Sequence, residues 1–321
     1  MPPKNIVVTG LVRSGTSWIG KMISLDDSLS HTFEPFHFNH RKIYGVYKIP
    51  TLYLYLNKND EELNKYIQDV FSHKYYYLDE ILHSKSFKKF IRKLIYTIPE
   101  HLKKSILNKN ALIKDPYLFF LGEYLQRNVE NLKMIYTIRR PEGFVYSFLR
   151  HETWDRHPIC DSLLKQPALI EDFKLGNYRD DLGKFANYEL SLKANGENKI
   201  IEKEVRLKRA CLICSFFARV YSKLKSKYKD EWIFLKYEEV ATNPLDEFEK
   251  IYIELDLEFS EKIKNQINEF TTSNKTKSKY IVDLKRNSKD LAFYWEKKLS
   301  ESEKEEIRRL TKFEYNMVYE K

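Results

Sequence analysis

A short loop containing two glycines, placed between a predicted strand and a predicted helix, constrains this chain most. The β-branched run Asn5–Thr9 ends at Gly10, and a helical pattern begins at about Ser17. Between them stands Gly10-Leu-Val-Arg-Ser-Gly15-Thr-Ser-Trp18. Backbone N–H groups of such a loop, together with the start of the next helix, form a cradle for a phosphate group. The alternative interpretation is an ordinary strand-to-helix turn.

The alternation of strand and helix recurs along the chain. Further strands are predicted over residues 111–113, 132–138 and 232–237. The helices predicted to follow them cover residues 117–126, 142–149 and 244–253. This alternation predicts a three-layer α/β fold, with a central and mainly parallel sheet flanked by helices.

Other segments have charged, helical patterns. They cover residues 60–71, 86–94, 202–228 and 301–312. Between residues 151 and 198 the pattern gives way to polar turns, which we interpret as an insertion or an acceptor-side loop region. With few glycines and prolines and no repeat, residues 1–321 are expected to form a single domain.

The residues after Gly15 distinguish the loop from that of a nucleotide triphosphatase. Those enzymes place Lys and then Ser or Thr directly after the second glycine, to reach the outer phosphates and to hold magnesium. Here Thr16 and Ser17 occupy these positions, and the cation is Arg13. The loop therefore favours a less highly charged phosphate group held without metal. A nucleotide kinase remains as a disfavoured alternative.

A second anion site is predicted at the end of another strand. Arg139-Arg-Pro141 follows the strand of residues 132–138, and Ser147 lies in the helix that comes next. A guanidinium at the strand end and a hydroxyl after one or two helical turns can converge on one phosphate, and arginine is suited to bidentate phosphate contacts. We assign no role to Arg140.

Both motifs resemble those of sulfotransferases that use 3′-phosphoadenosine 5′-phosphosulfate (PAPS). The run from Arg13 to Trp18 is similar to their 5′-phosphosulfate loop, so the resemblance assigns cofactor binding to the following residues: Arg13, Ser14, Gly15, Thr16, Ser17 and Trp18. Trp18 would contact the adenine, or else pack in the core. Arg139 and Ser147 would bind the 3′-phosphate. The segment from Arg286 to Trp295 loosely resembles a late loop that closes over the nucleotide, which makes Arg286 a second candidate cation or a surface residue.

The same resemblance also assigns residues to the sulfuryl-transfer reaction. Transfer of a sulfuryl group needs a base for the acceptor hydroxyl and cations near the bridging oxygen. Arg13 and Lys114 are the candidate cations, although Lys114 with Asp115 could form only a structural turn. Cytosolic members have a catalytic His two residues after that Lys, where this chain has Pro116. Glu34 is therefore our candidate base, as in several glycan and protein sulfotransferases, unless it only forms a salt bridge.

His37 is the alternative base. The combination of Glu34 with Lys114-Asp-Pro116 is more similar to glycan-modifying members than to phenol-modifying ones. The resemblance therefore implies PAPS as donor, its product 3′,5′-adenosine bisphosphate (PAP), and an acceptor hydroxyl on a saccharide. It implies no metal.

The overall composition limits the remaining classes. A formal charge of +10 favours anionic partners, and the basic stretch of residues 203–229 leaves open a non-enzymatic protein that binds an anionic polymer. No nucleic-acid-binding motif accompanies it. No apolar run approaches the roughly 20 residues of a membrane span. Three cysteines cannot form a disulfide framework, so we expect a cytoplasmic protein.

Two further groupings are given no site role. Cys211 and Cys214 have the spacing of zinc and redox motifs, but they lie in an apolar helical pattern and are expected to pack in the core. His151, Asp155 and His157 could be drawn as a metal trio, but they follow Ser147 closely and could instead contact the acceptor.

Overall fold

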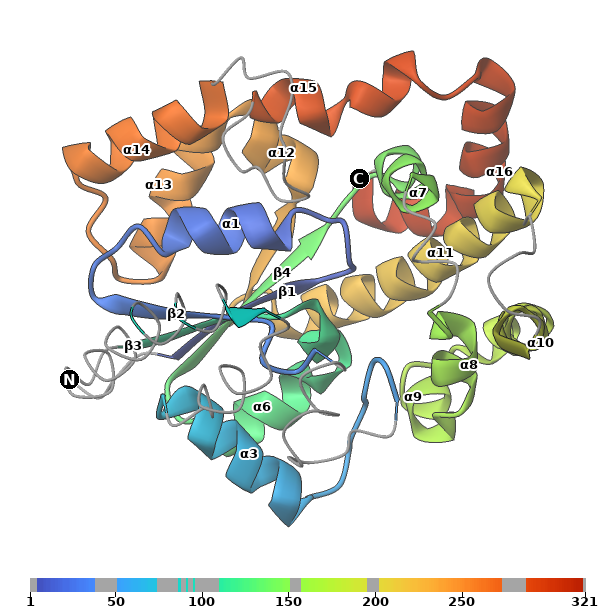
Figure 1. The fold of residues 1–321 in the computed structure, drawn as a ribbon, viewed down its shortest axis with the longest axis horizontal. Helices are drawn as coiled ribbons and strands as arrows, with labels where there is room; N and C mark the ends of the chain where they lie inside the picture. The colour runs from blue at the N-terminus through green and yellow to red at the C-terminus, as the bar shows by residue number, and fades with distance from the viewer. Residues whose placement is uncertain are drawn as a thin grey trace.

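The fold was obtained as a computed structural model, which describes residues 5–37, 51–73, 86–87, 91, 95, 110–150, 157–194, 202–272 and 287–319. Its centre is a five-stranded sheet in the order β2-β3-β1-β4-β5 (Figure 1). The strands are β1 (Asn5–Gly10), β2 (Leu29–Phe33), β3 (Asn110–Lys114), β4 (Leu132–Ile138) and β5 (Ile233–Lys236). Each described strand pairing is parallel. The predicted α/β fold class is confirmed.

Helices cover both faces of the sheet. One face carries α1 (Thr16–Ile23), α12 (Tyr237–Thr242), α13 (Pro244–Glu254) and α14 (Glu261–Thr272). The other face carries α3 (Glu61–Phe71), α6 (Gly122–Asn128), α7 (Pro141–Leu149), α11 (Lys203–Tyr228) and α16 (Glu301–Tyr319). Figure 1 shows α1 and α13 on the side of the sheet opposite to α3 and α6.

Alternation along the strands builds the two cores. In β1, Ile6 and Val8 pack with α1 and α13, while Val7 packs with the aromatic residues of the other face. Successive strand residues point to opposite faces, so a strand buried on both sides is apolar throughout. In the part of the chain that the structure describes, no helix is both long and apolar enough to cross a membrane.

Three segments differ from their predictions. The helix predicted over residues 117–126 begins as the 3-10 turn η1 (Pro116–Leu121) and becomes α-helical only in α6. The strand predicted to reach Tyr237 ends at Lys236, where α12 begins. Most of the helix predicted over 86–94 lies outside the described residues.

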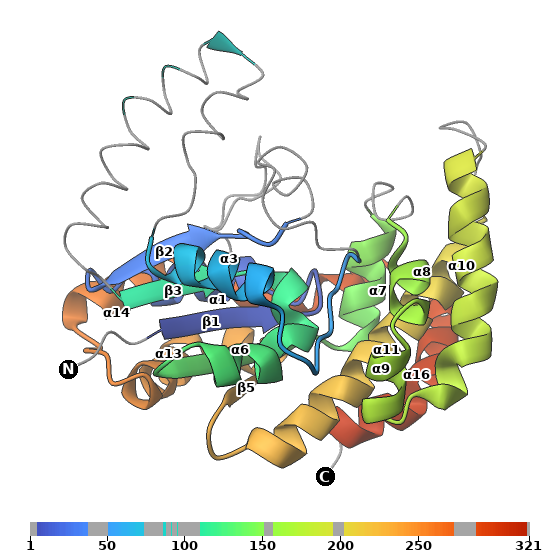
Figure 2. The ribbon, with the colours of Figure 1, turned by 90° about the horizontal axis from the view of Figure 1, so that it is seen from below.

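The third difference is the region expected to form polar turns. Its described part, residues 157–194, is helical: α8 (Ile159–Leu164), α9 (Pro167–Asp172), the 3-10 turn η3 (Gly176–Tyr178) and α10 (Arg179–Ala194). Figure 2 shows these helices beside α11 and α16, at one end of the sheet. Each element is short or weakly amphipathic, so its period is hard to recognise in the sequence. A buried ion pair between Glu189 of α10 and Arg209 of α11 holds the group in place.

Candidate active site

The candidate residues gather at one edge of the sheet, because parallel strands all end on the same side. Along this edge Glu34 follows β2, Lys114 ends β3, the glycine loop follows β1, Arg139 follows β4, and Tyr237 follows β5. The loop is therefore central, with the Glu34 and Lys114 pair on one side and Arg139 on the other. The strand order changes direction next to β1, which is where open α/β sheets bind ligands.

The glycine loop is fixed by hydrogen bonds to its own backbone and to β4. The Ser14 hydroxyl lies 3.0 Å from Thr137 Oγ1 and also donates to the Leu11 carbonyl oxygen. Arg13 adopts a left-handed backbone conformation with φ 70°. The first amides of α1, at Thr16 and Ser17, have no intrahelical partner by helix geometry. The loop thus presents a set of N–H groups beside a buried Ser14.

Gly15 is the helix N-cap, and no side chain fits at this position. Its φ of 87° is left-handed, and an added Cβ would overlap the ring of Tyr237. From the sequence, Tyr237 is the end of a predicted strand and has no predicted role in the site. The structure instead places this ring against the loop, and its position directly after a strand at the same edge is the sequence signal that could have identified it.

Arg139 lies between the loop and the C-terminal part of the chain. Its Nη1 donates to the Arg13 carbonyl oxygen at 3.3 Å, and its Nη2 donates to the Leu291 carbonyl oxygen at 3.0 Å. The guanidinium also lies over the Tyr237 ring, 4.8 Å from its centre. Among the described residues no carboxylate is hydrogen-bonded to Arg139. Burial raises the pKa of the nearby Glu238, and the charge of Arg139 partly offsets this.

The two predicted anion sites meet directly. Arg13 Nε donates to Ser147 Oγ at 2.9 Å, which brings the loop after β1 into contact with the helix after β4. Burial and the nearby charges of Arg139 and Arg150 lower the pKa of Arg13 to about 10. Like charges this close repel one another, so a bound anion would relieve the repulsion.

Glu34 and Lys114 form an ion pair on the other side of the loop. Lys114 Nζ donates to Glu34 Oε1, with the side chains 2% and 19% exposed. Burial lowers the pKa of Lys114, and Glu34 partly offsets this. Glu34 has φ 47°, a left-handed conformation that is uncommon outside glycine and concentrates at functional sites. The salt bridge that is the alternative role of Glu34 is present, and its partner is Lys114.

Asp115 links the segment that carries Glu34 to the segment that carries Lys114. Its carboxylate accepts from the Phe36 amide at 2.6 Å and from the Tyr117 amide at 2.9 Å. The segment after β2 is thereby tied to the start of η1. Complete burial, and next the charge of Glu34, raise the pKa of Asp115 to about 7.

Replacing Asp115 by Asn should flatten the dependence of stability on pH. The folded-state pKa of about 7 exceeds the ordinary 3.8, so the folded protein keeps a proton that the unfolded chain releases. The free energy of unfolding of the wild type should therefore fall as pH rises through this interval, by about 1.4 kcal/mol per unit at most.

Denaturant titrations between pH 5 and pH 7 measure this difference. The gap between wild type and Asp115→Asn should close by about 2 kcal/mol over that range. The exposed Asp230, changed to Asn, is the control and should follow the wild-type curve. Parallel curves for Asp115→Asn and wild type would show that Asp115 does not titrate in this range.

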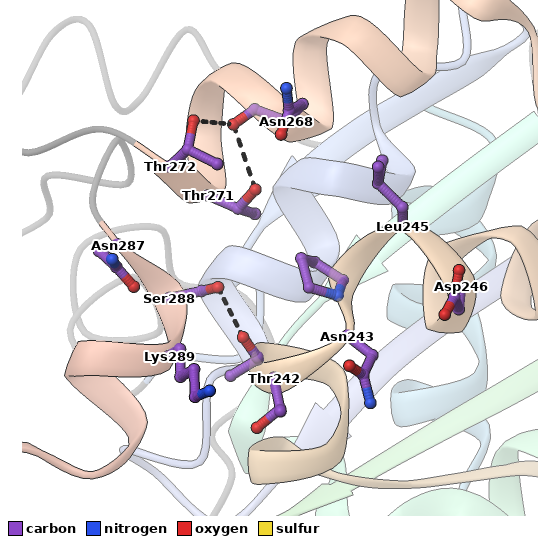
Figure 3. A pocket seen from close by; sticks show the side chains of 12 residues that line it. Thr242, Asn243, Leu245, Asp246, Asn268, Thr271, Thr272, Asn287, Ser288 and Lys289 are labelled. Atoms are coloured by element: carbon purple, nitrogen blue, oxygen red, sulfur yellow. Dashed lines mark hydrogen bonds between the residues drawn. The ribbon is translucent and has the colours of Figure 1, made fainter.

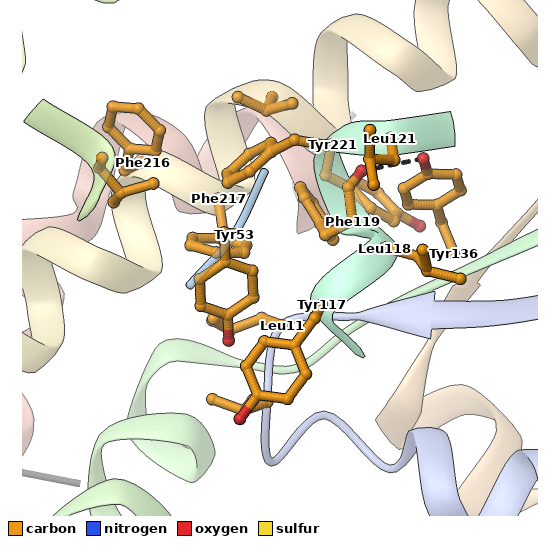
Figure 4. Close-up of a cluster of buried hydrophobic side chains, with 14 of the residues drawn as sticks. Leu11, Tyr53, Tyr117, Leu118, Phe119, Leu121, Tyr136, Phe216, Phe217 and Tyr221 are labelled. Carbon is orange, nitrogen blue, oxygen red and sulfur yellow. Dashed lines mark hydrogen bonds between the residues drawn. The ribbon is translucent and has the colours of Figure 1, made fainter. Parts of the chain in front are cut away.

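An aromatic cluster backs the loop. Tyr53 and Tyr117 lie with their ring centres 5.2 Å apart, and Tyr53 packs on Phe217 of α11. Figure 4 shows their hydroxyl ends on the same side of the cluster, near Leu11 of the loop. Burial raises the pKa of Tyr53 well above its ordinary value, so this hydroxyl stays protonated. The sequence interpretation gave Tyr53 no role, since nothing local marks it.

The other residues predicted for the site are Trp18, His37 and Arg286. Trp18 is 8% exposed and packs edge to face on Tyr237 and Phe248, as the core alternative expected. His37 stacks edge-on with Tyr117. Arg286 lies outside the described residues.

Several residues without an assigned role are also placed. Arg140 donates to the Tyr315 hydroxyl of α16 at 2.6 Å. Cys211 and Cys214 are buried within α11, which confirms that they pack in the core. His151 and Asp155 lie outside the described residues, while the carbonyl oxygen of His157 accepts from Arg209.

A family model matches nearly the whole chain. The profile described as "Sulfotransferase domain" matches residues 3–318. A search of curated proteins finds no match. Among solved structures, the "Sulfotransferase Domain from the Curacin Biosynthetic Pathway" is similar at 14% identity, covering 96% of each chain with a TM-score of 0.43.

Two other solved structures are similar at the same level. The "Sulfotransferase Domain from the Synechococcus PCC 7002 Olefin Synthase" has 14% identity over 97% of this chain and 94% of its own, with a TM-score of 0.45. The "sulfotransferase STF9 from Mycobacterium avium" has 11% identity over 99% of this chain and 77% of its own, with a TM-score of 0.41.

Proposed function

The chain belongs to the sulfotransferase family, and on that basis we propose that it transfers the sulfuryl group of PAPS to a hydroxyl group on a carbohydrate or glycoconjugate. One observation carries the proposal. The Arg139 guanidinium donates to the Arg13 carbonyl oxygen, and the Arg13 guanidinium donates to Ser147 of α7, the helix that follows Arg139. Two neighbouring cationic side chains beside a glycine loop suit a nucleotide that carries phosphate groups on both the 5′ and the 3′ position of its ribose.

The residues at the sheet edge fit such a donor. The loop amides and Arg13 would hold the 5′-phosphosulfate, because an uncapped helix start and a guanidinium both favour an anion. Arg139 and Ser147 would hold the 3′-phosphate. The lowered pKa of Arg13 supports this assignment, since part of it arises from Arg139 and Arg150, whose charges a doubly phosphorylated ligand would offset.

The chemical step uses the groups on either side of the loop. Glu34 takes the proton from the acceptor hydroxyl as the acceptor oxygen bonds to sulfur. The bond from sulfur to the bridging phosphate oxygen breaks, and PAP leaves. Arg13 and Lys114 stabilise the negative charge that develops on the bridging oxygen. Lys114 pairs with Oε1 of Glu34, so the second carboxylate oxygen remains for the acceptor.

The saccharide acceptor rests on the resemblance of Glu34 and Lys114 to glycan-modifying members. The side chain of Phe33, 50% exposed at the end of β2, adds an apolar surface next to the pair, and Lys114 Nζ lies 4.3 Å from its ring centre. An exposed ring beside a carboxylate is a suitable platform for the apolar face of a sugar.

Transfer of labelled sulfate tests the proposal. The protein is incubated with PAPS carrying ³⁵S and with three acceptor classes: oligosaccharides, simple phenols and tyrosine peptides. We expect label on an oligosaccharide together with release of PAP. Label only on a phenol or peptide would overturn the carbohydrate assignment, and no PAPS binding or consumption at all would overturn the donor.

A further inference from the structure

A C-terminal segment covers Arg139. This segment contains α15 (Ser288–Ala292) and the 3-10 turn η4 (Tyr294–Lys297). The Ser288 hydroxyl donates to the Ala241 carbonyl oxygen at 2.7 Å, beside a cavity of about 350 Å³ (Figure 3). This bond anchors α15 to α12, and the Leu291 carbonyl oxygen then accepts from Arg139. The segment is thus fixed against the guanidinium.

The side chains of Arg139 and Trp295 meet at Gly143, on the first turn of α7. A Cβ on Gly143 would lie 2.8 Å from Arg139 Nε and 3.2 Å from Trp295 Cδ1. Because Cδ1 is bonded to the indole Nε1, the Nε–H groups of both side chains lie close to the same point. The missing side chain of glycine is what leaves room for them there.

Both of these N–H groups are buried, and neither has an acceptor among the described residues. They are Arg139 Nε and Trp295 Nε1, and Trp295 is only 4% exposed. Buried donors without a partner are rare and cost free energy. The carboxylates near this place have other partners: Glu142 accepts from Arg308 of α16 at 3.0 Å, and Glu238 accepts from the Arg140 amide at 2.9 Å.

The start of α7 adds further donors to this place. The helix has nine residues and no side-chain cap, and its first residue, Pro141, has no N–H. The amides of Glu142 and Gly143 are therefore the ones without an intrahelical acceptor. A guanidinium, an indole N–H and an uncapped helix start together favour one acceptor with several oxygens and a negative charge. A phosphate group has these properties.

We infer that Trp295 is a further residue that binds the nucleotide. Its indole Nε1–H donates a hydrogen bond to the same phosphate group as Arg139. This inference rests on the proposed function, in which that group is the 3′-phosphate of PAPS. Trp295 and Arg139 together would distinguish PAPS and PAP from adenosine 5′-phosphosulfate, which lacks the 3′-phosphate.

Trp295→Phe tests this role, because it removes the indole N–H and keeps an aromatic ring. Calorimetry should show PAP binding weakened roughly 10-fold or more, as expected for a hydrogen bond to a charged group. Binding of adenosine 5′-phosphosulfate should change less than about twofold. The matched control is Trp232→Phe, which removes an indole N–H bonded to Gln126 at 3.0 Å. It should leave the ratio of the two affinities unchanged.

A second readout observes the indole directly. The chain has four tryptophans, so ¹⁵N labelling gives four indole N–H signals, which the Trp→Phe variants assign one by one. In the wild type the Trp295 signal should move when PAP is added and stay when adenosine 5′-phosphosulfate is added. If Trp295→Phe does not fold, this signal is assigned by elimination and the wild-type titration decides.

These measurements distinguish a failure of the proposed PAPS donor from a failure of the role of Trp295. A wild type that binds PAP no better than adenosine 5′-phosphosulfate contradicts the proposed donor. A wild type that prefers PAP, with a Trp295 signal that does not move and an unchanged preference in Trp295→Phe, overturns the inference about Trp295 alone.

Discussion

The Arg139→Ala variant is expected to bind PAP about 100-fold more weakly than the wild type. Hydrogen bonds to a charged partner contribute about 1.5–3 kcal/mol, and each 1.4 kcal/mol is a factor of ten in affinity. Arg139 also donates to the Leu291 carbonyl oxygen of α15, so its removal loosens the surroundings of the 3′-phosphate as well. Calorimetric titration with PAP measures the loss.

Two controls make this result specific. Arg127→Ala removes an equal charge from an exposed position on α6. This helix leads to the opposite edge of the sheet, so the variant should bind PAP normally. Adenosine 5′-phosphate, which lacks the 3′-phosphate, should bind the wild type and Arg139→Ala with similar affinity. An equal loss for both nucleotides would show that Arg139 shapes the loop and does not contact the 3′-phosphate.

The Glu34→Gln variant should keep PAP binding and lose turnover. A positioned base contributes typically 10²- to 10⁴-fold to rate, so kcat for sulfate transfer should fall within roughly that range. Glutamine has the same shape and keeps an oxygen for Lys114, but it cannot take the proton of the acceptor. Single-turnover transfer from labelled PAPS, measured alongside calorimetry, separates chemistry from binding.

The control for this variant is Glu130→Gln, an exposed carboxylate just before β4 that should not affect turnover. Unchanged turnover in Glu34→Gln would exclude Glu34 as the base and leave His37 as the candidate. Loss of PAP binding together with turnover would instead indicate that the ion pair with Lys114 shapes the nucleotide site.

Sequence reasoning identified the candidate site residues that follow strand ends. Parallel strands place their last residues at one edge, so the loop at Gly15, Lys114 and Arg139 were expected together, and β1, β3 and β4 are indeed neighbours. Local patterns are sufficient here because the apolar strands and the punctuating glycine and proline are strong signals.

The residues that sequence reasoning missed act through packing between distant segments. Tyr237 lies against Gly15, Asp115 binds the Phe36 amide, and Leu291 accepts from Arg139, yet no spacing in the sequence links these pairs. The helices of residues 157–194 were missed for a related reason. Their apolar positions pack against other elements and do not form a long, regular helical repeat in the sequence.

Our central claim is that one site at the sheet edge binds both the 5′-phosphate and the 3′-phosphate of an adenosine nucleotide. Calorimetry of the wild type with PAP and with adenosine 5′-phosphate, in buffer containing a metal chelator, tests it most directly. The claim predicts one site per chain, with PAP bound at least tenfold more tightly than the monophosphate and with no requirement for a divalent cation. Equal affinity for the two nucleotides, or binding that disappears with the chelator, would contradict it.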